Sequence, residues 1–385
     1  MPLSALPPAF DAALSGLLPG GPWELAVGVS GGADSTALAL LAQGFTRRHG
    51  GRVRAFIVDH GLREGSAAEA GLTRARLAAR GVAAEILTLS GLPTGAGLQA
   101  AARAARHEAL AAAACAAGCV FLLLGHHADD QAETVAMRAE RGEAGLEGMS
   151  RWSARRQVVV LRPLLGFGRQ ALRDWLGARG MAWVEDPSNA MARFERVRVR
   201  QAGTGKAARG GDERAAREAR DAEFLARHVA MRPEGFALLE ADAMPDTALG
   251  ALLRALGGAA YAPRREALAR LAARLGPATL GGVRILPAGR LGPGWLCVRE
   301  AAACAPPVAA RPGRRWDGRF LYEGTPGGWL GALGGEAGKF RRHGGLPAAV
   351  LAVMPAWRDE DGGIMFPAPA RFCPPQPLTS RPFWA

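Results

Sequence analysis

The chain has 385 residues, of which 49% are hydrophobic, so it can bury a sizeable core, and its length predicts two or three domains. Five scattered cysteines argue against a disulfide framework. The formal net charge of +13 fits a polyanionic partner such as a nucleic acid, although nearly all of it is arginine in an alanine-rich chain, which compositional bias also produces.

Targeting and membrane signals are weak in this sequence. The first ten residues carry no basic charge and no long apolar run, so we expect neither a secretory signal nor a mitochondrial leader, and a cytoplasmic location. The longest uncharged stretch, 109–125, is shorter than the roughly 20 residues of a membrane helix, so we expect no membrane association. Cys115 and Cys119 lack a second cysteine pair nearby, which favours core packing over metal binding.

Apolar runs alternate with alanine-rich helical patterns over the first 185 residues. The predicted strands cover 25–30, 53–60, 84–90, 119–126, 157–161 and 181–184. The predicted helices cover 35–49, 67–80, 98–117, 129–141 and 169–179. This alternation predicts an α/β fold with a doubly wound, mostly parallel sheet, in which ligands bind at the carboxyl ends of the strands.

The remainder of the chain changes character twice. Residues 201–220 are glycine-rich and charged without apolar periodicity, which predicts a linker after a first domain at 1–200. A mainly helical region with a short β tail is expected at 221–300. After an alanine- and proline-rich boundary, residues 312–385 are rich in Gly, Pro and Trp, which favours a small β-containing domain.

The strongest local motif, SGGADS, follows an apolar strand and precedes a helix. Its residues are Ser30, Gly31, Gly32, Ala33, Asp34 and Ser35. Glycines allow a tight turn, and the start of the following helix offers free N–H groups to phosphate, so the motif predicts an anion cradle. A Walker-type loop would need a lysine here and a Rossmann loop another glycine spacing, so neither is indicated. A glycine turn capped by Asp34 or Ser35 is the structural alternative.

Two further groups of polar residues follow predicted strands. Asp59 and His60 end the second strand, where Asp59 could bond a ribose or adenine, or could cap the turn. In HHADDQAET, a helical turn that began at His126 would place Asp130 and Glu133 on the same face, although Asp130 and Glu133 would also suit a capping box.

Two arginines lie on the preceding predicted helix. Arg103 and Arg106 are three residues apart and face the same way. Near an ATP site they could bind phosphate, and otherwise they form a solvated helix face.

These motifs, followed in order by RPLL at 162–165, EDPSN at 185–189 and the alternating arginines Arg196, Arg198 and Arg200, resemble the tRNA(Ile)-lysidine synthetase family over roughly 26–200. The loop itself resembles that of the ATP pyrophosphatase group, which cuts ATP between the α and β phosphates. The resemblance implies an adenine nucleotide alpha-hydrolase-like fold for this domain.

The implied reaction adenylates C2 of the wobble cytidine of a CAU-anticodon tRNA(Ile), releases pyrophosphate, and lets the amine of free L-lysine displace AMP. By position, residues 30–35 with Asp59 and His60 would bind ATP, and Asp34 would help hold Mg²⁺. Arg106 would lie near the reacting phosphate, while His126, Asp130 and Glu133 would orient lysine and assist its deprotonation. Asp186, Asn189, Arg196, Arg198 and Arg200 would border the tRNA anticodon.

The chain departs from the family pattern at three positions. His107 stands where a tyrosine is usual, Met191 where an acidic residue is usual, and Val197 where an asparagine is usual. Beyond residue 200 the best fragments of a thin likeness are Tyr261–Arg264, Thr279–Gly282 and RWDGRF at 315–320, and we expect these later regions to bind the tRNA body. The oligomeric state stays open, with a homodimer as one alternative.

Three other functions compete with this interpretation. A tRNA 2-thiolating enzyme of the same ATP group would usually have a lysine at position 33 and C-x-x-C pairs, which this chain lacks. A non-catalytic nucleotide- or RNA-binding module would not need Asp34, Asp130 and Glu133 together. A small-molecule amide or guanylate synthetase is disfavoured because no glutaminase-like Cys, His and acid set precedes the loop.

Overall fold

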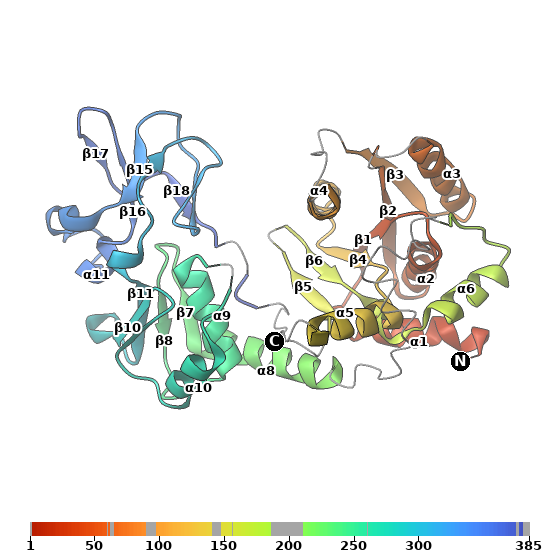
Figure 1. Ribbon diagram of the computed structural model, residues 1–385, viewed down its shortest axis with the longest axis horizontal. Helices are drawn as coiled ribbons and strands as arrows, with labels where there is room; N and C mark the ends of the chain where they lie inside the picture. Colours follow the sequence, from red (N-terminus) through yellow and green to blue (C-terminus); the bar gives the residue numbers. More distant parts are fainter. Residues whose placement is uncertain are drawn as a thin grey trace. The chain divides into compact units, whose positions relative to one another are not determined.

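The chain divides into two compact units, Met1–Ala216 and Arg217–Phe383, each with hydrophobic cores of its own (Figure 1). The computed structural model describes residues 2–59, 61, 65–89, 98–140, 148–155, 157–185, 211–259, 261–374 and 377–379. Within these ranges no helix combines the length and the apolar character that crossing a membrane requires.

The first unit is built on a six-stranded sheet with the order β3-β2-β1-β4-β6-β5. Its strands are β1 (Trp23–Val29), β2 (Gly51–Asp59), β3 (Ala83–Thr88), β4 (Phe121–Leu124), β5 (Trp152–Ala154) and β6 (Val159–Leu161). Every neighbouring pair is parallel except the edge strand β5, which runs antiparallel to β6. The predicted doubly wound, mostly parallel sheet is therefore confirmed.

Helices cover both faces of this sheet. They are α1 (Leu6–Ser15), α2 (Ala33–His49), α3 (Ser66–Ala78), α4 (Leu98–Ala116), α5 (Ala128–Glu140) and α6 (Arg169–Gly177), with short 3₁₀ helices at η1 (Leu3–Ala5) and η2 (Pro163–Gly166). Alternate residues of β1 enter two different cores: Leu25 and Val27 pack with α1, α2 and α6, whereas Ala26 packs with α4. Burial on both faces explains why this strand is a continuous apolar run.

The order of the strands reverses at the centre of the sheet. From β1 the chain moves outward through β2 and β3, and it then returns to the other side of β1 to form β4, β6 and β5. The carboxyl ends of β1 and β4 therefore meet at a topological switch point, where open α/β sheets bind their ligands.

Two local predictions differ from the structure. Residues 181–184, expected as a strand, form no strand; instead the Val184 N–H donates to the Gly31 carbonyl oxygen over 2.9 Å. That one bond holds the segment against the loop after β1, outside the sheet. Strand β5 was not predicted, because three residues are too few to display an alternating pattern.

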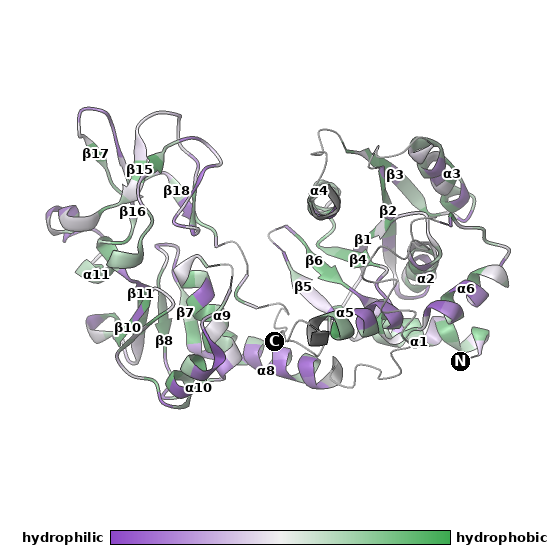
Figure 2. Ribbon diagram, viewed as in Figure 1, coloured by the Kyte–Doolittle hydropathy of each residue, from purple (hydrophilic) through white to green (hydrophobic). Residues whose placement is uncertain are grey.

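The second unit contains more sheet than the short β tail expected after a helical region. Helices α8 (Gly211–His228), α9 (Asp246–Gly257) and α10 (Arg265–Ala273) are present, and α8, which begins inside the predicted linker and reaches both units, is largely hydrophilic (Figure 2). The antiparallel sheet that follows has the order β7-β8-β11-β10-β9. Its strands are β7 (Val229–Met231), β8 (Ala237–Leu239), β9 (Ala278–Leu280), β10 (Val283–Pro287) and β11 (Trp295–Arg299).

Two small antiparallel sheets complete the unit, as the β-containing character of 312–385 indicated. The first comprises β12 (Val308–Ala309), β15 (Trp329–Ala332), β16 (Pro355–Arg358) and β17 (Ile364–Met365). The second comprises β13 (Arg315–Trp316), β14 (Phe320–Tyr322) and β18 (Ala370–Phe372). Along the chain, the 3₁₀ helix η6 (Gly334–Phe340) and α11 (Ala348–Leu351) connect β15 to β16, and two shorter 3₁₀ turns, η4 (Gly289–Leu291) and η5 (Ala301–Ala303), flank β11.

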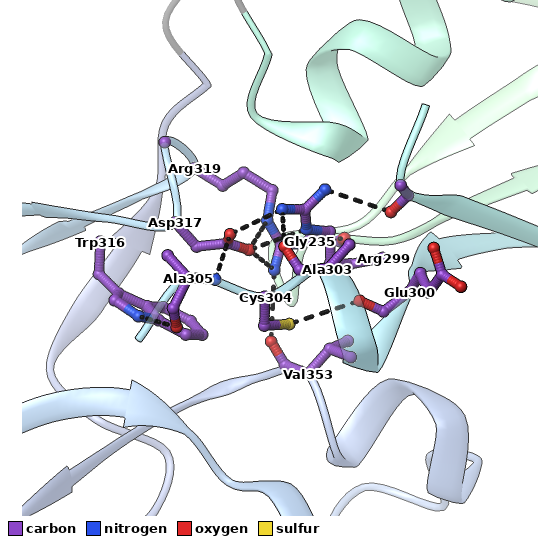
Figure 3. Close-up of polar contacts among 12 residues, drawn as sticks. Gly235, Arg299, Glu300, Ala303, Cys304, Ala305, Trp316, Asp317, Arg319 and Val353 are labelled. Carbon is purple, nitrogen blue, oxygen red and sulfur yellow. Dashed lines mark hydrogen bonds and ion pairs between the residues drawn. The ribbon is translucent and has the colours of Figure 1, made fainter. Parts of the chain in front are cut away.

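A buried ion-pair network joins parts of this unit that are distant in sequence (Figure 3). The Asp317 carboxylate contacts Arg299 at 2.9 Å and the fully buried Arg319 at 2.7 Å. Arg319 also donates to the carbonyl oxygens of Gly235 and Val353, each at 3.4 Å. Burial lowers the pKa of Arg319, opposed by the charge of Asp317. Asp317 and Arg319 thus serve the interior of the unit.

We expect the substitution Asp317→Asn to lower the free energy of unfolding by about 3–5 kcal/mol, because it leaves a buried guanidinium without its counter-charge. Asparagine tolerates the left-handed backbone found at Asp317, where φ is +50°, so the charge is the main change. Guanidinium titrations would measure the loss.

The exposed pair Glu323–Arg371 in the same unit offers a matched control. Glu323→Gln should cost less than about 1 kcal/mol, since solvent screens that pair. Equal small losses for Asp317→Asn and Glu323→Gln would contradict the structural role assigned to the buried network.

Candidate active site

The loop after β1 has a shape that only glycine permits at its second residue. Gly31 has φ of +84°, and a Cβ atom there would lie 2.8 Å from the Thr73 hydroxyl oxygen. Gly32 is extended, Ala33 starts α2, and the Thr36 N–H already bonds the Gly32 carbonyl oxygen. The N-terminal N–H groups of α2 therefore follow directly on the glycine turn, as an anion cradle requires.

The two serines of this loop brace each other. The Ser30 N–H donates to the Ser35 hydroxyl oxygen over 3.1 Å, and the two hydroxyl oxygens are 3.2 Å apart. The Ser35 hydroxyl donates in turn to the Gly32 carbonyl oxygen at 3.1 Å. Ser35 is buried and holds the turn closed, whereas Ser30 is exposed at the loop surface.

Residues after β4 lie directly beside this loop. Parallel pairing aligns Gly28 of β1 with Leu124 of β4, so both strands end at the same level. Gly125 follows, and a Cβ atom there would lie 3.2 Å from the backbone nitrogen of Ser35. Glycine thus lets the turn after β4 approach the first turn of α2, which brings His127 and Asp130 close to Asp34.

His127, which the sequence did not single out, lies at the centre of the site. Its imidazole is buried, and Nε2 is 3.4 Å from Oδ2 of Asp34 and 3.4 Å from Oδ2 of Asp130. Burial disfavours its charge, but the hydrogen bond with Asp34 and the charges of Asp130, Asp34 and Asp129 outweigh burial and raise the pKa of His127.

His127 and Asp130 also close the start of α5 reciprocally. The Asp129 N–H donates to Nδ1 of His127 over 3.2 Å, and the His127 N–H donates to Oδ2 of Asp130 over 3.0 Å. This is a capping box with histidine as the cap, and it differs from the predicted Asp130–Glu133 box. Because Nδ1 accepts a backbone N–H, the proton of the neutral ring belongs on Nε2, which faces the carboxylates. In the sequence, the signal that could have pointed to His127 was the pair of adjacent histidines followed closely by two adjacent aspartates.

His126 has the opposite environment. Burial, followed by the charges of Arg162, Arg103 and Arg106, lowers the pKa of His126 to about 3. The same kind of environment lowers the pKa of His107 on α4 to about 4. Nδ1 of His126 is buried and has no hydrogen-bond partner in the described part of the chain. His126 is therefore a neutral imidazole with one unpaired ring nitrogen, and it lies in the field of several guanidinium groups.

The arginines around His126 come from two elements. Arg103 and Arg106 project from α4, as predicted, and their charges act on His126 and His107. Arg162, which was not predicted as a site residue, is buried after β6 and donates to the Ser150 carbonyl oxygen and to the Ser153 hydroxyl, both at 3.0 Å. This side of the site is suited to an anion.

The remaining predicted residues differ in what the structure says of them. Glu133 is buried on α5, one turn after Asp130. Asp59 is buried at the end of β2, and its Oδ1 accepts the Gly61 N–H over 3.0 Å, which is the turn-capping alternative. Six predicted ATP- or tRNA-binding residues lie outside the described ranges: His60, Asp186, Asn189, Arg196, Arg198 and Arg200.

Asp34 retains one oxygen for a ligand. Its Oδ2 faces His127, whereas its Oδ1 is buried and has no hydrogen-bond partner among the described residues. The same residues contain no group of three or more His, Cys, Asp and Glu side chains arranged to hold a metal. One free carboxylate oxygen fits Mg²⁺, which commonly takes one or two protein carboxylates and completes its shell with substrate phosphates and water.

A glycine-rich anion cradle at the switch point, with a carboxylate in the first turn of its helix, defines a PP-loop enzyme of the class that uses ATP. A family model described as "PP-loop domain" matches residues 13–205.

Similar proteins identify the particular family to which this chain belongs. The chain is 38% identical to the tRNA(Ile)-lysidine synthase of Ruegeria pomeroyi, over 88% of this chain and 87% of that protein. The tRNA(Ile)-lysidine synthase of Mesorhizobium japonicum is 39% identical over 76% of this chain and 70% of its own length. This chain belongs to the tRNA(Ile)-lysidine synthase family.

One solved structure shows a weaker likeness. The U34-tRNA thiolase NcsA from Methanococcus maripaludis, with its [4Fe-4S] cluster, is 18% identical, with a TM-score of 0.43, over 52% of this chain and 71% of that one. A similarity at that level identifies neither a substrate nor a reaction.

The substitution His127→Asn should distinguish the two roles of His127, which are to cap α5 and to contact Asp34. Asparagine is a good N-cap, so α5 should persist, but the Nε2 contact is lost. Because partners that orient a metal-binding carboxylate typically contribute 10–100-fold, we expect kcat/KM for ATP, measured by pyrophosphate release, to fall by about that factor. Wild-type turnover, or a loss that only follows unfolding, would contradict this assignment.

Because the pKa values of His107 and His126 are lowered in the folded state, the free energy of unfolding should depend on pH. Between about pH 6.5 and their folded-state values the unfolded chain binds more protons, so the free energy of unfolding should fall as pH drops through that window. His107→Gln should flatten the fall between pH 6.5 and about 4 in pH-dependent unfolding. Identical slopes for the wild type and His107→Gln would refute the effect.

Proposed function

We propose that this chain ligates free L-lysine to C2 of the wobble cytidine of CAU-anticodon tRNA(Ile), using ATP and releasing AMP and pyrophosphate. The cytidine O2 attacks the α-phosphorus of ATP, pyrophosphate leaves, and the lysine amine then attacks C2 and displaces AMP. The observation that carries this proposal is the meeting of Asp34 and Asp130 at the buried His127, next to a cationic side around His126. Family membership supports it.

ATP would lie on the loop 30–35, with its pyrophosphate portion at the N–H groups of the first turn of α2. Asp34 would direct its open Oδ1 toward Mg²⁺, which neutralises phosphate charge when bound. His127 holds the other oxygen of Asp34, so the carboxylate is oriented before ATP arrives. Asp59 and His60 would contact the nucleoside.

Arg106, with Arg103 and Arg162 beside it, would stabilise the charge that develops as pyrophosphate leaves. Burial and, after it, the charges of these arginines lower the pKa values of His126 and His107. Neutral histidines there add no further positive charge, and they leave the guanidiniums to bind phosphate oxygens.

Lysine would bind with its ammonium toward Asp130 and Glu133, because only the neutral amine attacks C2 and a carboxylate must first hold and then accept the proton. His126, with a pKa of about 3, is neutral near pH 7 and offers the open Nδ1 as a hydrogen-bond acceptor. His126 would therefore orient the amine, while the carboxylates take its proton.

The tRNA would be held by residues of both units. Asp186, Asn189, Arg196, Arg198 and Arg200 are proposed to border the anticodon, and the second unit to bind the tRNA body as part of a region at 221–300 and a small domain at 312–385. A net charge of +13 supports phosphate contacts. We further propose a cytoplasmic enzyme, and a homodimer is compatible with the proposal.

The test is ATP-dependent incorporation of radiolabelled lysine into CAU-anticodon tRNA(Ile), with AMP and pyrophosphate followed in parallel. We expect all three products from the wild type, and a loss of at least 100-fold for Asp34→Ala, in line with removal of one preorganised charged group. Asp174→Ala, an exposed acid on α6, is the matched control and should match the wild type.

AMP and pyrophosphate without label in the tRNA would reassign the nucleophile while keeping the ATP chemistry. If neither ATP cleavage nor labelling occurred, a binding module would be indicated instead. Sulfur insertion would be indicated by sulfide-dependent rather than lysine-dependent modification.

A further inference from the structure

A pocket with four arginines lies at the opposite end of α2 from the PP loop. It has a volume of about 310 Å³, and Arg47, Arg48, Arg80 and Arg179 line it together with Leu40, Leu41 and Trp175. No acidic residue is among the described residues that line it. Its volume is at the lower end of the range for small-molecule sites.

The arginines approach from three separate elements. Arg47 and Arg48 belong to the last turn of α2, Arg80 follows α3, and Arg179 follows α6. Arg48 is paired with Asp11 at 2.7 Å, so its charge is balanced. Among the described residues, Arg47, Arg80 and Arg179 form no ion pair with a carboxylate. All three side chains are exposed, so solvent screens their mutual repulsion, and their guanidinium groups stay accessible to an anion in the pocket.

Helix ends account for only part of this arrangement. Cations near helix C-termini are stabilised by the helix dipole, and Arg80 donates to the Arg179 carbonyl oxygen at 2.8 Å while Arg179 donates to that of Trp175 at 3.2 Å. A guanidinium has five N–H donors, so most donors of Arg80 and Arg179 remain for another ligand.

Trp175 forms part of the wall of the pocket. The side chain is 5% exposed, and its indole Nε1 is buried without a hydrogen-bond partner in the described ranges. Arg179 lies over the Trp175 ring, 4.1 Å from its centroid. The Trp175 ring therefore gives the pocket an apolar wall on which the Arg179 guanidinium is stacked.

The pocket is separate from the active site. Asp34 and Arg47 stand in the first and last turns of α2, and thirteen residues of α-helix span about 20 Å. A ligand of this volume cannot contact both ends of α2.

We propose that this pocket is a second binding site for a small polyphosphate anion. Guanidinium groups pair with phosphate oxygens through two parallel hydrogen bonds, and three of them suit a ligand with at least two phosphate groups. Inorganic pyrophosphate and the phosphate portion of a nucleoside triphosphate share this chemistry. The apolar side chains of Leu40 and Leu41 would favour the nucleoside form, and the small volume would favour free pyrophosphate.

Isothermal titration calorimetry of the full chain with inorganic pyrophosphate, and separately with a non-hydrolysable ATP analogue, tests the proposal. The wild type should bind two equivalents of at least one ligand, one at the PP loop and one at the pocket. Asp34→Ala should weaken only the PP-loop equivalent, so a failure of the proposed lysidine chemistry would leave the second equivalent intact.

Arg47→Ala should weaken the pocket equivalent by about tenfold or more, the typical effect of losing a charge-assisted hydrogen bond. The control is Arg270→Ala, which removes an exposed arginine from the last turn of α10 and leaves the pocket unchanged.

If a second equivalent of pyrophosphate binds, the ligand of the pocket is free polyphosphate. If a second equivalent is seen only with the ATP analogue, the ligand is a nucleotide. Either result supports the proposal. A single equivalent with both ligands would overturn it. An equal loss of affinity in Arg47→Ala and Arg270→Ala would also overturn it, since that result indicates only a general effect of net charge.

Discussion

The first unit depends on the parallel pairing of β1 with β4 at the centre of its sheet. That pairing brings two loops distant in sequence to the same edge, where Gly125 lets α2 and the turn after β4 meet at backbone distance. Asp34 and Asp130 then both contact Nε2 of one buried imidazole. A side chain at position 125 would separate these loops, and His127 would lose the carboxylates that offset its burial.

Adjacent histidines in this site experience opposite fields. His127 faces carboxylates, which raise its pKa, and His126 faces arginines, which add to burial in lowering its pKa. The site is therefore divided into a side that favours cations and a side that favours anions. Ligation of an amine with ATP requires both, because a metal ion and an ammonium group must be held within a few ångströms of phosphates. The short chain between the two histidines keeps these fields close together.

The second unit uses charge for a different purpose. Asp317 and Arg319 belong to one of the fragments that resemble the family beyond residue 200, and both are buried and hold segments of this unit together. Their pairing gives both residues a structural role that needs no contact to RNA. If this unit binds tRNA as proposed, its phosphate contacts would come from exposed basic side chains.

The sequence by itself determined the alternation of strands and helices, the parallel sheet, the phosphate loop and the resemblance to lysidine synthetases, because apolar periodicity, glycine and a contiguous motif are local properties. It also indicated Asp34, Asp130 and the arginines of α4. Only the tertiary structure decided that His127 rather than His126 joins the carboxylates, that 181–184 docks on Gly31 instead of forming a strand, and that Arg47, Arg80 and Arg179 surround one pocket. Burial and long-range charge fix these features, and both depend on residues brought together by folding.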